Sequence, residues 1–224
     1  MKVVLSLGGS LVTKELTAQN FKKYADVILK LKKDGHQLVV VIGGGSTCRL
    51  YQGIAKENGA DNVVLDRIGI AATHLNALTL VGCLGEESFP TTFRKPEEVK
   101  QNFGEKIVVC GGDLPGRSTD YDAVLFAETI KADLLINATN IDGVYEKDPK
   151  NFPKAKKFKK LTFKQFEEII TNNVQKPGEY RLFDLLGAQL LRKIKIKMVI
   201  INGNDPKEIV RVVEGKHNGT VVWK

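Results

Sequence analysis

Sulfur-containing and aromatic residues are scarce in this chain. Its 224 residues include three cysteines, two methionines and one tryptophan, and 7% of them are aromatic. An odd number of cysteines without CxxC spacing argues against a disulfide framework and against a zinc site. We interpret the dispersed histidines as loop or surface residues rather than metal ligands; they are His36, His74 and His217, and the cysteines are Cys48, Cys83 and Cys110. The sequence therefore predicts no metal site in the protein and a reducing compartment.

Long hydrophobic runs are missing as well. Hydrophobic residues make up 42% of the chain, but no apolar run approaches the roughly 18 to 20 residues that span a bilayer. The first seven residues lead straight into a glycine pair, are too short for the hydrophobic region of a signal peptide and lack a small-residue cleavage site. We therefore expect a cytoplasmic protein without a membrane segment, whose first residues form a core strand.

Acidic residues are outnumbered by basic ones. The chain has 26 Asp and Glu against 34 Lys and Arg, which gives a net charge of +8. Such an excess suits anionic partners, among them nucleic acid, membrane surfaces and phosphorylated small molecules. The densest basic stretches, 154–160 and 192–197, are typical of solvated faces or strand flanks, and no aromatic-lined basic strand motif supports a nucleic-acid groove. We expect no nucleic-acid partner, while a phosphorylated small molecule stays open.

Short apolar runs rich in β-branched residues alternate with longer amphipathic stretches. This alternation predicts an α/β protein with a mostly parallel central sheet covered by helices. The expected strands are 2–7, 37–42, 106–110, 132–138 and 197–202, and the expected helices are 17–33, 47–58, 68–85, 123–130, 162–172, 184–193 and 205–214. No internal repeat and no linker rich in Gly, Pro and Ser divides the chain, so one compact unit is expected.

Glycines follow several of these strands directly. They are Gly8-Gly9, Gly43-Gly44-Gly45, Gly111-Gly112 and Gly203. The carboxyl edge of a parallel sheet is where ligands bind, and glycine there lets backbone N–H groups approach an anion. Tight turns alone are the alternative explanation. Because several such loops share one edge, the pattern favours phosphate binding.

Two common nucleotide-binding motifs do not fit. The segment 111–118 nearly matches the P-loop pattern GxxxxGK[ST], but Arg117 stands where the motif has lysine and Pro115 removes an amide from the loop. No Walker-B carboxylate closes the expected strand 132–138. The glycines at 43–45 are not followed by the glycine that Rossmann spacing requires. The chain is therefore not a P-loop protein, and a dinucleotide site is disfavoured.

Six segments in a fixed order carry a family resemblance. They are the strand into Gly8-Gly9-Ser10, then 43–49 (GGGSTCR), 66–77 (DRIGIAATHLNA), 111–120 (GGDLPGRSTD), 138–149 (ATNIDGVYEKDP) and 217–220 (HNGT). Over nearly its whole length the chain resembles the archaeal type of UMP kinase in the amino acid kinase superfamily. The element D-G-V-Y-x-x-D-P marks the superfamily. The element D-x-x-G-x-x-x-T-x-x-N-A, with arginine after the triple glycine, narrows the resemblance to the UMP kinase branch.

The resemblance implies one amino acid kinase domain, residues 1–224, with a three-layer α/β/α fold. Residues 1–110 would form the acceptor (UMP) side and residues 111–224 the donor (ATP) side. The implied reaction transfers the γ-phosphoryl group of ATP to UMP to give UDP, in pyrimidine nucleotide biosynthesis. UMP and ATP are the expected small-molecule partners, Mg²⁺ is expected on the triphosphate, and a homohexamer is the expected assembly, with 17–33 and 66–80 as plausible contacts.

The resemblance also implies an acceptor site. Arg49 suits the acceptor phosphate because its guanidinium is a planar fork, and Asp66 suits ribose hydroxyls because it accepts hydrogen bonds. A surface arginine and an N-cap or solvent-facing carboxylate are the alternatives. The full set of UMP-binding residues implied is Gly43, Gly44, Gly45, Arg49, Asp66, Gly69, Thr73, Gly112 and Thr119.

Donor and catalytic residues follow from the same resemblance. The ATP-binding set is Gly8, Gly9, Ser10, Thr139, Asn140, Asp142, Gly143, Tyr145 and Asp148, and the catalytic set is Gly8, Gly9, Ser10 and Asp120. An Asx-turn would account for Asp142-Gly143 taken alone, and Thr119-Asp120 could cap a helix beginning near Asp122. The acceptor phosphate, with a second pKa near 6, is largely ionised at neutral pH. No general base is therefore required.

The sequence departs from the wider family at three places. Many relatives have lysine two residues before the first glycine, where this chain has Ser6, and bacterial UMP kinases have lysine where it has Asn140. The cation that stabilises the transition state is therefore unassigned, with Lys14, Lys157 and Lys160 as candidates by position. The segment 179–184 is bulkier than in some archaeal relatives, although Asp184, its last residue, matches the family's aspartate.

Two other functions compete with UMP phosphorylation. A kinase of the same fold could act on another phosphorylated acceptor such as isopentenyl phosphate, but those kinases have a histidine where the apolar ester binds, and Arg49 and Asp66 argue against this reading. A non-catalytic storage or binding protein on the same scaffold is suggested by the missing lysine. The complete set of donor and acceptor residues opposes it.

Overall fold

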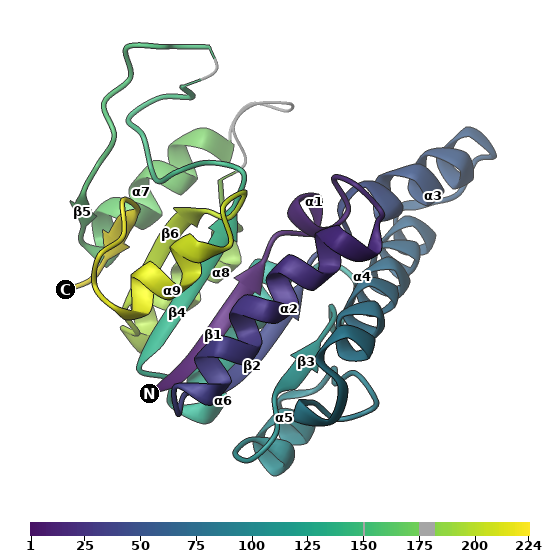
Figure 1. Ribbon diagram of the computed structural model, residues 1–224. Coiled ribbons are helices and arrows are strands. Elements are labelled where there is room, and N and C mark those ends of the chain that lie inside the picture. The colour runs from purple at the N-terminus through teal and green to yellow at the C-terminus, as the bar shows by residue number, and fades with distance from the viewer. Residues whose placement is uncertain (150, 175–181) are drawn as a thin grey trace.

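One sheet runs through the whole molecule (Figure 1). The computed structural model describes residues 1–149, 151–174 and 182–224. Within these ranges the strand order is β3-β2-β1-β4-β6-β7-β5. The strands are β1 (Lys2–Leu7), β2 (Gln37–Ile42), β3 (Val108–Cys110), β4 (Leu134–Thr139), β5 (Lys160–Leu161), β6 (Met198–Asn202) and β7 (Thr220–Val222). The first five in spatial order are parallel to one another, β7 runs antiparallel to β6, and β5 pairs in parallel with β7. The predicted mostly parallel sheet is confirmed.

The central strands are apolar on both faces because helices cover both. β1 is buried from Val3 to Leu7 and β2 from Leu38 to Ile42. Successive side chains of a strand point to opposite faces, so Val3 and Leu5 enter one core while Val4 enters the other. Continuous apolar runs of this kind are typical of parallel strands buried on both sides. The three-layer α/β/α sandwich is therefore confirmed.

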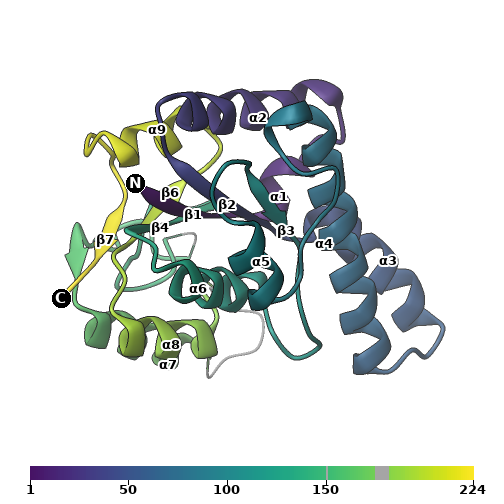
Figure 2. The ribbon, with the colours of Figure 1, turned by 90° about the horizontal axis from the view of Figure 1, so that it is seen from below.

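The helices divide between the two faces (Figure 2). α2 and α9 cover one face, and α6, α7 and α8 cover the other, each contributing its apolar stripe to the corresponding core. α4 joins the core of the first face and α5 that of the second. The bounds are α1 (Gly9–Val12), α2 (Ala18–Lys33), α3 (Gly45–Glu57), α4 (Asn62–Leu84), α5 (Pro96–Asn102), α6 (Thr119–Ile130), α7 (Phe163–Val174), α8 (Leu185–Ile194) and α9 (Lys207–Val213).

Capping side chains set several helix boundaries. Thr17 accepts a hydrogen bond from the Asn20 amide, so the helix expected over 17–33 begins at Ala18. Asp61 caps α4 through the Val64 amide, and the expected start at 68 is therefore wrong. Asp66 therefore lies inside α4, in the same helix as the other residues of the motif 66–77.

Short elements escaped the sequence analysis. The segment after β1 was expected to be a glycine loop, but α1 begins there, and α5, β5 and β7 were not expected either, nor was the 3₁₀ turn Gly85–Glu87. These elements span between two and seven residues, which is too short for hydrophobic periodicity to show. Tertiary contacts determine them instead. The Thr13 hydroxyl, for example, closes α1 by donating to the Gly9 carbonyl at 2.8 Å.

α3 and α4 project from one end of the sandwich (Figure 1). The segment Asn62–Glu87 is long and apolar enough to cross a membrane by length and composition alone, a test that a core helix also passes. Ala77, Leu80 and Leu84 of α4 are buried in the protein core, whereas Leu75 and Leu78 are exposed. A helix placed between a core and an exposed apolar face acquires this composition without a bilayer.

Candidate functional site

The glycine loops meet at the carboxyl edge of the sheet, as the sequence predicted. Backbone hydrogen bonds connect them: the Gly8 amide donates to the Ala138 carbonyl at 2.9 Å, and the Gly43 amide to the Leu7 carbonyl at 3.1 Å. Gly203 closes the row, because its amide donates to the Thr139 carbonyl at 2.7 Å. The ends of β1, β2, β4 and β6 thus form one continuous rim, which is where ligands bind in open parallel sheets.

Two glycines on this rim are required by geometry. A Cβ on Gly9 would lie 2.3 Å from both the Gly43 carbonyl oxygen and the Gly45 amide nitrogen. Gly45 has φ +61°, and a Cβ there would lie 2.2 Å from the Thr13 hydroxyl. A larger residue at either position would meet a neighbouring main chain that has no room to move. The loops that follow β1 and β2 therefore pack backbone against backbone and leave their amides close together.

Side chains of α4 and α1 hold the β2 loop in place. The Asn76 amide group donates to the Gly43 and Gly44 carbonyls at 2.9 and 3.1 Å. On the other side, the Thr13 hydroxyl accepts the Ser46 amide at 2.7 Å. Asn76 was quoted within its motif but not assigned to the site. Its full burial beside two glycine carbonyls explains why an amide side chain is found there.

The loop after β3 is fastened to the same helix. The Gly112 amide donates to the Thr73 hydroxyl at 2.8 Å, and the Gly112 carbonyl lies 3.0 Å from Nε2 of His74. Thr73 was predicted to line the UMP pocket, and it is buried with its hydroxyl occupied by Gly112 and Ile70. The expectation that His74 is a loop or surface residue is wrong: it is half-buried within α4, and burial lowers its pKa despite its bond to Gly112.

The remaining predicted acceptor residues lie around this helix pair. Asp66 is half-buried in α4, and its carboxylate accepts the Gly116 amide at 2.8 Å. Arg49 is exposed on α3, one turn after Gly45. Both charges act on the half-buried thiol of Cys48. The pKa of this thiol is raised, first of all by burial; Arg49 opposes the shift and Asp66 adds to it. Gly69 packs directly against Cys48, so the structure brings these residues together.

Asp120 lies at the centre of the rim, at the start of α6. Its Oδ1 accepts hydrogen bonds from the Ser6 hydroxyl at 3.2 Å and from the Asn137 amide group at 2.9 Å. Burial raises the pKa of Asp120 to about 6, the Ser6 bond opposing the shift. Ser6, the position at which the family resemblance implies lysine, therefore lies beside this aspartate. Asn137 is a further residue that the sequence analysis missed.

Thr119 and Asp120 do not cap the following helix. Ser118 is the N-cap, and its hydroxyl accepts the Tyr121 amide at 3.2 Å, so α6 begins at Thr119 rather than near Asp122. The alternative role considered for the Thr-Asp pair is thus wrong. Both residues lie in the first helical turn, where the positive end of the helix dipole favours an anion. Thr119 also faces Gly43, since a Cβ there would lie 3.6 Å from its hydroxyl.

The predicted donor side is built from side chains. Oδ1 of Asp142 accepts the Tyr145 hydroxyl at 2.7 Å, and Oδ2 accepts the Lys157 ammonium at 2.7 Å. Burial opposes ionisation of Asp142, but the bonds from Lys157 and Tyr145 prevail and lower its pKa. The pKa of Tyr145 is raised to about 12, by burial first and then by its bond to Asp142. Lys157 also donates to the Asn218 carbonyl at 3.0 Å.

A polar pocket of about 530 Å³ opens next to Asp142. Besides Asp142 it is lined by Asn202, Asn204, Asp205, Glu208, Asn218 and Gly219, of which the sequence analysis assigned only Asp142. Two features of the sequence could have identified these residues: the HNGT element and the turn after the last long strand. Gly143 packs against Thr220, where a Cβ would lie 2.5 Å from the hydroxyl. Of the other predicted donor residues, Thr139 ends β4, Asn140 is exposed, and Asp148 accepts a bond from Asn151.

The three candidate cations are placed differently. Lys157 is bonded to Asp142, Lys14 follows α1 and is exposed, and Lys160 is exposed on the edge strand β5. Of the bulky segment 179–184, residues 179–181 lie outside the described residues. Asp184 caps α8 by accepting the Gly187 amide at 2.9 Å, and its charge contributes to the raised pKa of Asp120.

The glycine rim, the polar pocket beside it and the mostly parallel sheet together suit a protein that binds phosphorylated ligands. The model of the amino acid kinase family matches residues 1–202, and the chain belongs to this family. It is 40% identical to uridylate kinase of Methanocaldococcus jannaschii over 227 residues, covering 99% of each chain. It is 41% identical to that of Archaeoglobus fulgidus over 224 residues, covering 99% and 100%. The crystal structure of the latter superposes with a TM-score of 0.88 at 39% identity, covering 99% of this chain and 100% of that one.

Proposed function

We propose that this protein is a nucleoside monophosphate kinase that transfers the γ-phosphoryl group of ATP to UMP, giving ADP and UDP. The observation that carries the proposal is similarity to uridylate kinases over 99% of the chain at about 40% identity. The glycine rim and the arginine beside it supply the matching chemistry. We place the reaction in cytoplasmic pyrimidine nucleotide biosynthesis.

The acceptor would bind on the α3–α4 side of the rim. Arg49 and the amides of Gly43, Gly44 and Gly45 would hold the UMP phosphate, which needs charge-assisted donors. Asp66 would accept ribose hydroxyls, exchanging its present bond to Gly116. Gly69, Thr73, Gly112 and Thr119 complete this side. Because Gly112 is fixed by Thr73, the acceptor side extends past residue 110 into the second half of the single domain.

The donor would bind at the other end of the rim. Asp142 and Tyr145 and the polar pocket next to them would hold the adenosine, together with Thr139, Asn140, Gly143 and Asp148, while Gly8, Gly9 and Ser10 would face the triphosphate. Mg²⁺ would enter with ATP. No group of three His, Cys, Asp or Glu side chains lies in metal-binding geometry in the described ranges, so direct ligation would involve one or two side chains beside phosphate oxygens and water.

In the reaction an oxygen of the ionised UMP phosphate attacks the γ-phosphorus, and the bond from that phosphorus to the β–γ bridging oxygen breaks in line. Catalysis of this kind is positioning and electrostatic stabilisation. The rim amides and the N-terminus of α6 would stabilise the charge on the transferring group. Asp120, held by Ser6 and Asn137, would order the groups around it.

The test is a coupled assay of ATP consumption with Mg²⁺ against UMP, dUMP, CMP, AMP and isopentenyl phosphate. We expect a strong preference for UMP. In Arg49→Ala, KM for UMP should rise by about 10-fold or more, as expected when a charged hydrogen bond of roughly 1.5–3 kcal/mol is lost, while ATP binding persists. A flat acceptor panel despite ATP binding would contradict the proposal and favour another acceptor or a binding protein.

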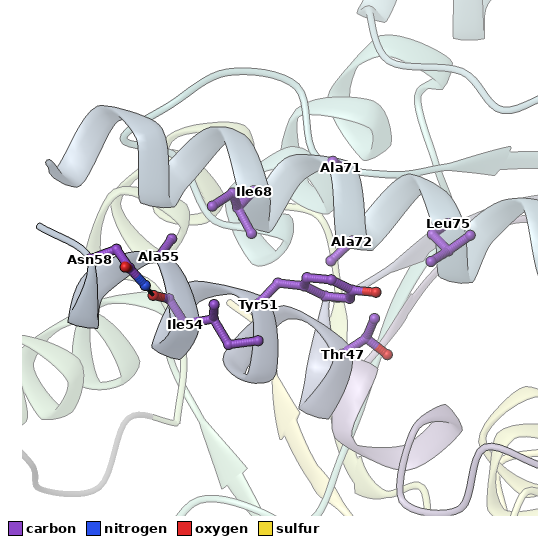
Figure 3. A pocket seen from close by; sticks show the side chains of 9 residues that line it. All are labelled: Thr47, Tyr51, Ile54, Ala55, Asn58, Ile68, Ala71, Ala72 and Leu75. Carbon is purple, nitrogen blue, oxygen red and sulfur yellow. Dashed lines mark hydrogen bonds between the residues drawn. The ribbon is translucent and has the colours of Figure 1, made fainter. Parts of the chain in front are cut away.

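We further propose that the protein assembles with copies of itself, as a homohexamer, through the face of α3 and α4 shown in Figure 3. Tyr51 and Ile54 of α3 and Leu75 of α4 are exposed there, beside a hollow of about 470 Å³. Leu50 of α3 and Val63, Val64 and Leu78 of α4 are exposed on the same two helices. An apolar surface of this kind on a water-soluble domain is typical of a protein interface.

Light scattering after gel filtration tests the assembly. Ile54→Glu should reduce the particle mass, because a buried charge at an apolar interface costs several kcal/mol. Leu186→Glu is the matched control, since Leu186 is also exposed but belongs to α8, outside this helix pair. Unchanged mass in Ile54→Glu would show that the interface lies elsewhere.

A further inference from the structure

A buried carboxyl group behind the acceptor loop has no part in the chemistry proposed above. Asp122 of α6 is fully buried. Its Oδ2 accepts the Asp113 amide at 3.1 Å, and its Oδ1 has no hydrogen-bond partner within the described ranges. A buried polar atom without a partner costs free energy. Because the carboxyl group of Asp122 is buried at this cost, we expect it to hold another part of the protein in place.

The Asp113 amide is the next peptide after Gly112. Gly112 is already fixed at its amide by Thr73 and at its carbonyl by His74, and Nδ1 of His74 lies 2.9 Å from the Thr92 hydroxyl. Asp122 holds the N–H of the same peptide group whose carbonyl lies against His74, and it does so from α6 rather than from α4. Two successive peptides of the loop are thus held by three side chains from two helices.

Asp122 also closes the loop on itself. The chain leaves β3 at Cys110, passes through Gly112 and Asp113, and enters α6 at Thr119, so a bond from Asp122 back to Asp113 joins the two ends. Gly112 and Thr119, both assigned to the acceptor side, lie at these two ends. Their separation therefore depends on this bond.

We propose that Asp122 is a positioning residue of the acceptor site: by holding the Asp113 amide it sets the placement of Gly112 and Thr119 around the acceptor phosphate. The inference rests on the proposed function for what the loop binds. The placement of the loop itself is independent of that function and can be measured without substrate.

Asp122 also faces other ionisable groups. Those packed near it are Asp113 and Arg117 of the loop, Asp184 before α8, and Cys110 at the end of β3. Burial raises its pKa to about 7; the Asp113 amide and Arg117 oppose the shift, and the Asp113 and Asp184 carboxylates add to it. A neutral carboxyl group still accepts the Asp113 amide. The side chain of asparagine is neutral and has the same shape, so it should accept the Asp113 amide in place of Asp122.

Three variants separate positioning from general stability. Asp122→Asn keeps an oxygen for the Asp113 amide, Asp122→Ala removes it, and Val124→Ala truncates a fully buried side chain of the same helix without touching the loop. We expect Asp122→Ala to raise KM for UMP by about 10-fold, with kcat and KM for ATP within about 3-fold, because a buried amide loses its partner. Asp122→Asn should restore KM to within about 2-fold. Val124→Ala should lower Tm and leave KM for UMP unchanged.

Hydrogen exchange of the Asp113 amide supplies a readout that needs no activity. Exchange should accelerate at least about 10-fold in Asp122→Ala and stay near wild type in Asp122→Asn and Val124→Ala. Equal rises in both KM values, a Val124→Ala variant that matches Asp122→Ala, or unchanged exchange would overturn the inference. If the wild-type protein does not phosphorylate UMP, the proposed function fails, and the exchange measurement still decides whether Asp122 positions the loop.

Discussion

The proposed acceptor side and the proposed donor side of the rim are built in different ways. On the acceptor side the contacts run between main-chain atoms and buried side chains: Asn76, Thr73 and Asp122 each hold a peptide of a glycine loop. On the donor side they run between side chains, as in the Asp142, Tyr145 and Lys157 cluster. In the proposed reaction the acceptor side would therefore be in place before substrate arrives, whereas the donor cluster would exchange its internal bonds for bonds to a ligand.

This difference follows from what each side must recognise. A phosphate that receives a phosphoryl group needs several amides at fixed positions, because misplacement of the reacting atoms by about 1 Å can cost about 100-fold in rate. A nucleoside offers separate donors and acceptors that individual side chains can match. Substitutions should consequently affect the acceptor side through backbone placement and the donor side through single contacts.

The largest effect is expected at the glycine contact of the acceptor side. Gly9→Ala would place a Cβ 2.3 Å from main-chain atoms of Gly43 and Gly45, and neither neighbour is a flexible side chain. We expect activity to fall by at least about 1,000-fold or the fold to be lost, because the two loops must separate.

Gly53→Ala is the matched control, since Gly53 lies in α3 with nothing within 4 Å of the added atom. It should keep activity and gain up to about 1 kcal/mol in the free energy of unfolding, as measured by thermal denaturation. Normal activity in Gly9→Ala would break the comparison, because it would show that the loops after β1 and β2 are not packed tightly.

Asp120 lies where the two sides meet, and its charge should matter more than its contacts. Asp120→Asn should lower kcat by about 100-fold, the usual scale for a preorganised electrostatic group, with both KM values within about 3-fold. Because the pKa of Asp120 is raised to about 6, wild-type kcat should fall as the pH drops below 6 and the carboxylate takes up a proton. In Asp120→Asn this limb should be shallower, because only the UMP phosphate, whose second pKa is also near 6, still takes up a proton there.

An exposed aspartate, Asp26 of α2, provides the control for Asp120. Asp26→Asn should leave the rate and its pH profile unchanged. A profile with the same limb in Asp120→Asn would assign the titration to another group.

Loss of a single donor contact should have a smaller effect. Lys157→Met removes the ammonium bound to Asp142 and the Asn218 carbonyl, and we expect KM for ATP to rise about 10-fold, the scale of one charged hydrogen bond. Lys159→Met, two residues away and exposed, should change little. If kcat falls by 100-fold or more instead, Lys157 is the cation that stabilises the transition state.

The smallest effect is on stability and depends on pH. Since the folded-state pKa of Asp122 is raised from 3.8 to about 7, the folded protein binds this proton more tightly, and the stability that it contributes is lost as pH rises through 7. Asp122→Asn carries no such loss. Its Tm should match wild type near pH 4, pull ahead between about pH 4 and pH 7, and exceed it by about 4 °C at pH 8.5. A constant difference across this range would rule out ionisation of Asp122.

Sequence reasoning was most successful where one physical rule acts locally. The strands 2–7 and 37–42 were predicted at the bounds observed, because uninterrupted apolar runs are forced by burial on both faces. It failed for α1 and for the start of α4, where a threonine hydroxyl and an aspartate cap outweigh periodicity. His74 was misjudged because a lone histidine carries no sign of the loop that it contacts.

The sequence by itself determined the fold class, the glycine rim and the family, because burial periodicity, glycine after each strand and ordered motifs are all local patterns. Only the tertiary structure decided which side chains hold the rim. Asn76, Asp122 and Asn137 contact peptides or carboxylates that are 9 to 33 positions away in the sequence. A hydrogen bond over such a separation depends on how the helices pack against the sheet, and this packing leaves no periodic trace in the chain.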